Sequence, residues 1–214
     1  MKSNSRIVAR TAVVLVVVSW LALPLEAADF IVSVSRVVGQ ARYQTNGLSW
    51  VDLRTGDRIS SGTFLQTNKT NSIVNLKLIE PNLCSKSTLQ VLPNSGLNII
   101  KARPESSEPG VPKPIRLKVH FGRILLTLGD KCNQAFELSS PLGAILVAKP
   151  SELDEVIFVF SERALTVVKG ELTTQTTGTA PRKVKAGQQF LVANGEVFAV
   201  PADAPELRLD REMD

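Results

Sequence analysis

Apolar and polar side chains alternate with a period of two along much of the chain, and this pattern predicts β-strands. In Ile115–Phe121, every second residue is apolar, and Arg116, Lys118 and His120 occupy the positions between. Ile73–Ile79 alternates in the same way. Each of these segments is therefore expected to turn one face to a core and the other to water.

Glu155–Phe160 differs, because it is apolar on both faces, which is typical of a central strand covered on each side. Residues after 28 show no extended helical period, although Asp203 and Pro205 suit the start of a short helical turn. Short strands separated by turn residues predict an all-β fold with little or no helix. We expect a twisted antiparallel β-sandwich or a short solenoid-like domain.

Turn residues mark where these strands end. Asn194-Gly195 lies between two apolar runs and predicts a two-residue type I′ hairpin, since both positions of that turn need positive φ. Asn46-Gly47 is a weaker example of the same signal. Gly56 and Gly62 are expected to close tight turns on both sides of a very short strand. Ile59 and Leu65 would then point inward.

The chain also contains an internal echo, that is, a repeated spacing of glycines with similar flanking residues. Gly39 is followed 17 residues later by Gly56, and Gly170 is followed at the same distance by Gly187, with an apolar strand before each first glycine. Phe121–Leu125 opens a third, partial copy around its own glycine. The echo predicts repeated β-units with turns at these glycines.

The N-terminus has the layout of a secretory signal peptide. Basic residues precede the 13-residue apolar run Thr11–Leu23, and small residues at Ala27 and Ala28 suit cleavage. We expect residues 1–28 to be removed, which would make the protein periplasmic or secreted. The alternative is an uncleaved anchor, in which case the domain would stay on the membrane.

The rest of the chain is expected to form one β-domain over residues 29–201, followed by a charged tail over residues 202–214. Residues 102–114 hold four prolines, which cannot donate to a sheet ladder, so this stretch predicts a loop within the domain. The formal net charge of +5 is spread along the chain and does not favour nucleic-acid binding. Cys84 and Cys132 predict one disulfide in an exported protein, with two buried thiols as the alternative.

Candidate chemistry is sparse. His120 is the single histidine and is expected to be a solvated residue of a polar face, because no partnered nucleophile or carboxylate accompanies it. Arg116, Lys118 and Arg123 could form a basic stripe for an anionic glycan or lipid head group, although a wet sheet face is the simpler interpretation. Trp50 is expected in the core, and the low aromatic content disfavours a stacking platform for sugars or bases.

Two further motifs give little information about function. Glu152, Asp154 and Glu155 lack the frame of a calcium loop and predict a solvated turn. Asn68-Lys69-Thr70 matches a glycosylation sequon, which would carry no weight in a bacterial protein. The sequence therefore predicts no catalytic residues, no metal site and no cofactor.

The motif G-D-x-I-x-x-G-x-x-L-x-T, from Gly56 to Thr67, together with V-x-A-G-Q ending at Gln188, resembles the FecR-like domain family over residues 34–200. One departure is Val147–Pro150, where the family typically has Arg-Gly-Thr. The resemblance implies a non-enzymatic bacterial envelope domain that binds or senses an envelope protein or glycan, or serves as a structural module.

The founding members of that family are membrane-spanning regulators with a cytoplasmic segment that holds a sigma factor. Here ten residues precede the apolar run, so that segment is not expected and the regulatory mechanism does not transfer. A membrane-tethered signalling regulator is kept as the alternative, and it requires the N-terminal segment to stay uncut. The oligomeric state is not predicted.

Overall fold

The computed structural model describes residues 30–68, 70–78, 86–101, 114–129, 132, 135–148 and 155–208. Several sequence predictions lie outside these residues: the signal peptide and its cleavage, Cys84, most of the proline-rich stretch, and the acidic residues Glu152 and Asp154. These stay predictions.

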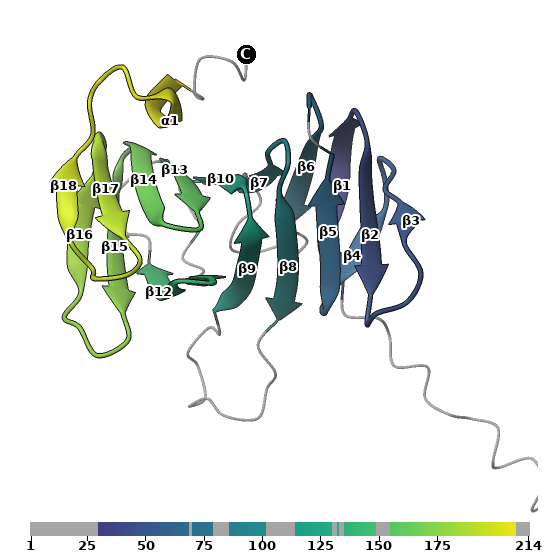
Figure 1. The fold of residues 1–214 in the computed structure, drawn as a ribbon, viewed down its shortest axis with the longest axis horizontal. Helices are drawn as coiled ribbons and strands as arrows, with labels where there is room; N and C mark the ends of the chain where they lie inside the picture. The colour runs from purple at the N-terminus through teal and green to yellow at the C-terminus, as the bar shows by residue number, and fades with distance from the viewer. Residues whose placement is uncertain are drawn as a thin grey trace, which may run out of the picture.

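The described residues form two nine-stranded sheets that enclose one main hydrophobic core (Figure 1). In spatial order, sheet A contains β18 (Val197–Ala199), β17 (Gln188–Leu191), β14 (Ala164–Lys169), β13 (Val156–Ser161), β10 (Arg123–Leu128), β7 (Thr88–Val91), β6 (Ile73–Leu78), β1 (Phe30–Val38) and β4 (Arg58–Ser60). Sheet B contains β16 (Arg182–Lys185), β15 (Glu171–Thr176), β12 (Gly143–Ala148), β11 (Phe136–Ser140), β9 (Ile115–Phe121), β8 (Gly96–Lys101), β5 (Thr63–Thr67), β2 (Ala41–Thr45) and β3 (Val51–Asp52).

In both sheets the spatial order of the strands nearly follows their order in the sequence. Figure 1 shows the strands following one another from the purple N-terminal end to the yellow C-terminal end. Neighbouring described strands are antiparallel, apart from the parallel pair β9 and β11. The all-β prediction is confirmed, and the architecture is a two-sheet sandwich in which strands join the sheets nearly in chain order.

The predicted alternation decides which side chains enter the core. In β9, Leu117 and Val119 are buried, whereas Arg116 and Lys118 are exposed on the face turned away from sheet A. Full burial of each such aliphatic side chain contributes about 1.5–3 kcal/mol relative to exposure. Phe121 departs from the prediction, because the register of β8 and β9 shifts at Gly96 and places its ring outside the core.

Strand β13 is covered on both faces, as its sequence predicts. Val156, Phe158 and Phe160 join the main core, whereas Ile157 and Val159 join a smaller buried cluster on the other side of sheet A. The helix α1 (Pro205–Arg208) contacts the neighbouring strand β14, and its formation confirms the predicted C-terminal helical turn. No helix in the described part of the chain is long and apolar enough to span a membrane.

The internal echo corresponds to a repeated four-strand unit. β1 pairs with β4 while β2 pairs with β3, and likewise β14 pairs with β17 while β15 pairs with β16. In the turn at Gly56, the N–H of Arg54 donates to Asp57 Oδ2 at 2.8 Å. In the turn at Gly187, the N–H of Lys185 donates to Gln188 Oε1 at 2.9 Å. The two units therefore use the same device, and one lies toward each end of the sandwich.

The predicted glycine turns are present. Positive φ angles are found at Gly39, Gly56, Gly62, Gly170, Gly187 and Gly195. Around the strand β4, φ is 95° at Gly56 and 82° at Gly62, and Ile59 and Leu65 are both buried. The stretch from Gly56 to Leu65 is thus a strand enclosed by two turns that L-residues rarely adopt.

Of the two Asn-Gly predictions, the weaker one, at Asn46-Gly47, is confirmed, and the stronger one, at Asn194-Gly195, is wrong. Asn46 and Gly47 have φ of 52° and 73°, and Leu48 N donates to Thr45 O at 3.0 Å, which defines a type I′ turn. The two-residue hairpin at Asn194-Gly195 is wrong, because Asn194 does not have positive φ. The chain takes a longer route there, in which Gly195 N donates to Leu191 O and Glu196 N donates to Asn194 Oδ1.

Cys132 is buried and is not a free thiol. Its expected partner, Cys84, lies outside the described residues, so the pairing of the two cysteines stays a prediction.

Candidate functional site

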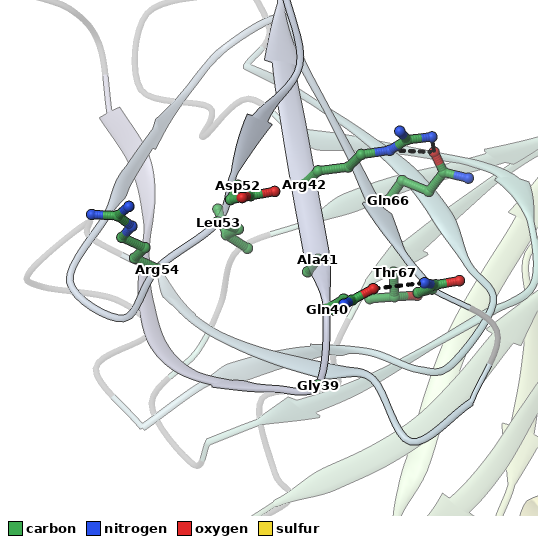
Figure 2. Close-up of a pocket in the computed structure, with 10 residues that line it drawn as sticks. Gly39, Gln40, Ala41, Arg42, Asp52, Leu53, Arg54, Gln66 and Thr67 are labelled. Carbon is green, nitrogen blue, oxygen red and sulfur yellow. Dashed lines mark hydrogen bonds between the residues drawn. The ribbon is translucent and has the colours of Figure 1, made fainter.

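A polar hollow opens on sheet B near the edge formed by β2 and β3 (Figure 2). Its volume is about 600 Å³, which falls in the usual range of small-molecule sites. Strands β2, β3 and β5 supply half of the lining residues, and the segments before β2 and after β3 and β5 supply the other half. The hollow is lined by Gly39, Gln40, Ala41, Arg42, Asp52, Leu53, Arg54, Gln66, Thr67 and Asn68.

The register of the strands explains which side chains reach the hollow. Ala41, Leu53 and Thr67 are buried and form its floor, whereas Arg42 and Asp52 are exposed. Leu53 N donates to Ala41 O at 2.9 Å, which continues the pairing of the two segments beyond β3. Alternation along each strand thus places buried side chains beneath the hollow and exposed polar side chains around it.

Two pairs of planar polar side chains are held across neighbouring segments. Arg42 and Gln66 are directly paired residues of β2 and β5, and Arg42 Nε and Nη2 donate to Gln66 Oε1 at 3.3 and 3.0 Å. Asn68 Nδ2 donates to Gln40 Oε1 at 3.0 Å. Figure 2 shows both pairs with their bonds as dashed lines. These bonds restrict the rotamers of four side chains before any ligand arrives.

Arg42 is held on a second side by Trp50. Its guanidinium carbon lies 4.3 Å from the centroid of the indole ring, which is a cation–π contact. The bonds to Gln66 use two of the five N–H donors of the guanidinium and leave three, of which two lie along the edge formed by Nη1 and Nη2. That edge has the geometry that binds a carboxylate through two parallel hydrogen bonds.

Asp52 is the cross-strand partner of Arg42 on β3. Arg42 turns instead toward Gln66 and Trp50, and within the described residues Asp52 has no ion pair or side-chain hydrogen bond. Arg42 and Asp52, whose carboxylate is unpaired within the described residues, therefore line the same hollow. Figure 2 shows Arg54 on the far side of Asp52 from Arg42.

An outer aromatic cluster, defined here as Trp50, Phe64, His120 and Phe121, adjoins the hollow through Arg42. The Trp50 and Phe64 rings meet edge-on with centroids 5.7 Å apart, and Phe64 and His120 do so at 5.1 Å. Gly96 leaves the space for this cluster, since a Cβ there would lie 2.6 Å from the Phe121 ring and 3.0 Å from the Phe64 ring.

The position of Trp50 corrects the prediction that it belongs to the core. Its side chain is 38% exposed and contributes to the outer aromatic cluster. The alternation around Val51 did not locate it because β3 has only two residues, Val51 and Asp52. An exposed tryptophan next to polar side chains is a common element of binding surfaces.

His120 is not a solvated residue of a polar face, contrary to its prediction. Its ring meets Phe64 edge-on, and within the described part of the chain Nε2 is buried without a hydrogen-bond partner. Burial lowers the pKa of His120 below its usual value, and the neighbouring charge of Lys118 lowers it further. The neutral imidazole is thus the favoured form in the folded protein.

The predicted basic stripe does not form as a unit. Arg116 and Lys118 share the outer face of sheet B, but Arg123 belongs to sheet A. Arg116 pairs with Glu137 at 2.8 Å, and Arg123 lies 3.8 Å from Glu206 of α1. Both pairs are solvent-exposed, and such pairs contribute little to stability.

The remaining sequence candidates lie apart from one another. Glu155 pairs with Lys169 at 2.8 Å and does not border the hollow. Asn68 of the sequon lines the hollow, and Lys69 is outside the described residues. In the described ranges, no group of three or more His, Cys, Asp or Glu side chains is placed to hold a metal ion.

The residues that line the hollow were missed from the sequence. Arg42 and Gln66 occupy polar positions of alternating strands, which is the one available signal, and their pairing depends on register between segments 24 residues apart. No protein-family model matches the chain, and no curated protein or solved structure matches it. The resemblance to FecR-like domains accordingly stays a prediction.

Proposed function

We propose that this chain is an exported, non-enzymatic module of the bacterial envelope that binds a saccharide in the polar hollow. The arrangement of Arg42 carries the proposal: Gln66 and Trp50 fix its guanidinium, and Arg42 lines the same hollow as Asp52, whose carboxylate is unpaired within the described residues. A saccharide presents many hydroxyl groups that both donate and accept, which suits a surface of guanidinium, amide and carboxylate groups.

The hydrogen bonds across the hollow support a binding role. The Arg42–Gln66 and Gln40–Asn68 pairs are formed without a ligand, so fewer rotamers have to be ordered on binding. Trp50 is partly exposed and packs against Arg42, so an apolar surface adjoins the polar groups that line the hollow. The export part of the proposal is supported by the N-terminal charge and hydropathy pattern alone.

Binding is tested with the purified full chain on an immobilised array of bacterial envelope saccharides, followed by calorimetry with the best binder. Arg42→Ala is expected to weaken binding at least tenfold. The matched control is Arg182→Ala, which removes another exposed arginine from the opposite edge of sheet B and should leave affinity unchanged. Thermal unfolding of both variants checks that the fold is intact.

Absence of saccharide binding by the wild-type chain would contradict the proposal, as would equal losses in the two variants. The export component has its own test. Mass spectrometry of the native protein should find a first residue at Ala28 or Asp29, and an intact N-terminus would favour the membrane-tethered alternative.

A further inference from the structure

We infer that the saccharide bound in the polar hollow is acidic, with a sugar carboxylate on the Nη1–Nη2 edge of Arg42 and sugar hydroxyl groups on Asp52. This inference rests on the proposed function and specifies its ligand class. It concerns the chemistry of three charged side chains that border one hollow: Arg42, Asp52 and Arg54.

The anchoring of Arg42 determines which group it can bind best. Because Nε and one N–H of Nη2 face Gln66, the side chain cannot rotate to present another edge without losing both hydrogen bonds. The remaining edge offers two parallel N–H donors, and a planar carboxylate matches this geometry better than a single hydroxyl group does. Contact with the Trp50 face keeps the guanidinium in its plane.

Asp52 accounts for the saccharide part of the ligand. Its carboxylate accepts hydrogen bonds and donates none at neutral pH, so it suits sugar hydroxyls or an N-acetyl N–H. It would repel a compact anion with no hydroxyl groups. A small inorganic anion therefore fits the hollow less well than an acidic sugar, which brings a carboxylate and hydroxyl groups in one molecule.

The charges of the residues that line the hollow also favour an acidic ligand. Two arginines and one aspartate line the hollow, and within the described residues the side chain of Arg54 has no ion pair. Backbone bonds hold the turn that carries Arg54, with Asp57 N donating to Arg54 O at 3.1 Å. An excess of positive charge over a defined volume of about 600 Å³ favours an anionic ligand of one to a few sugar rings.

The test uses matched oligosaccharides that differ in one group. Affinities are measured by calorimetry for glucuronic-acid and glucose trimers, galacturonic-acid and galactose trimers, and N-acetylmuramic-acid and N-acetylglucosamine dimers. At low salt, at least one acidic member is expected to bind at least tenfold more tightly than its neutral counterpart. Arg42→Gln should abolish that preference, and Arg42→Lys should not restore it, since an ammonium cannot bind a carboxylate through two parallel bonds.

Asp52→Asn separates the two roles. It should weaken the neutral member of a pair and leave the preference for the acidic member in place or increased, because the substitution also removes a negative charge that repels the sugar carboxylate. Equal affinity of the wild-type chain for both members of every binding pair would overturn this inference while leaving the proposed function intact. Failure of all six saccharides to bind would contradict both. Chloride and acetate serve as competitors, and inhibition by acetate alone to the same extent as by the acidic sugar would also overturn the inference.

Discussion

The hydroxyl of Ser95 is hydrogen-bonded to both backbone polar groups of Arg123. Its Oγ accepts from Arg123 N at 2.8 Å and lies 3.0 Å from Arg123 O, to which it donates. Ser72 and Gln40 repeat the first of these bonds at 3.0 Å. In each case the serine follows an asparagine of positive φ, and the residue it binds follows a glycine. This contact ties the crossover between the two sheets to a neighbouring turn.

Gly122, which precedes Arg123, has no room for a side chain. A Cβ there would lie 2.3 Å from Ser95 Oγ and 2.4 Å from Asn94 O, and φ is 79°. Gly178 has the same φ of 79° but open space around it. Gly178→Ala should therefore cost about 1–2 kcal/mol of unfolding free energy from the backbone angle alone. Gly122→Ala should cost clearly more, and equal losses in urea unfolding would contradict the close contact.

Removal of the Ser95 hydroxyl tests the hydrogen bonds between Ser95 and Arg123. Ser95 is fully buried, so Ser95→Ala leaves Arg123 N without its partner and is expected to cost about 1–3 kcal/mol. Ser139→Ala is the control, because Ser139 is half-buried on β11 and takes part in no side-chain hydrogen bond in the described part of the chain. Urea unfolding of both variants gives the comparison. A Ser95→Ala protein as stable as the control would show that these hydrogen bonds contribute nothing to the free energy of unfolding.

The strands and their inward faces could be predicted because they depend on local alternation. Leu117 and Val119 of β9 follow the period of two, and Gly56 and Gly62 are required by their φ angles wherever the strands lie. Phe121 escaped prediction because a register shift opposite Gly96 reverses its face. Such a shift depends on the partner strand and leaves no local signal.

The candidate site could be predicted only to the level of a polar face. Arg42 was visible as an outward residue, but its contacts with Gln66 and Trp50 depend on pairing between separate segments. His120 was placed on the correct face, yet its burial depends on Phe64 of another strand. Tertiary neighbours thus decided the chemistry of side chains whose orientation the alternation had already indicated.

The predicted disulfide between Cys84 and Cys132 would close a loop with 47 residues between its ends. Such a cross-link contributes about 4 kcal/mol through the entropy of the unfolded chain. Free thiols counted in denatured protein should be absent before reduction and present afterwards. Equal counts in the two samples would refute the bond. The reduced protein should unfold at lower urea, and Cys132→Ala should behave similarly in the presence and absence of reductant.

His120 predicts how stability changes with pH. Burial and Lys118 lower its pKa in the folded protein below the ordinary value of 6.5, which the unfolded chain retains. Between these two pKa values the unfolded chain binds more protons, so the free energy of unfolding rises with pH in this window. Stability contributed by neutral His120 is complete above the unfolded pKa and is lost as pH falls through the window.

The other groups on this face do not reverse that sign. Asn98 of β8 and Phe64 of β5 are uncharged, and Lys118 is positive. Because the chain contains one histidine, its ring proton signal can be followed by NMR and should titrate below pH 6.5. His120→Asn should flatten the dependence of unfolding free energy on pH between about pH 5 and 7. Lys118→Met should raise the pKa of His120, and a histidine that titrates above 6.5 in the wild type would contradict its burial against Phe64.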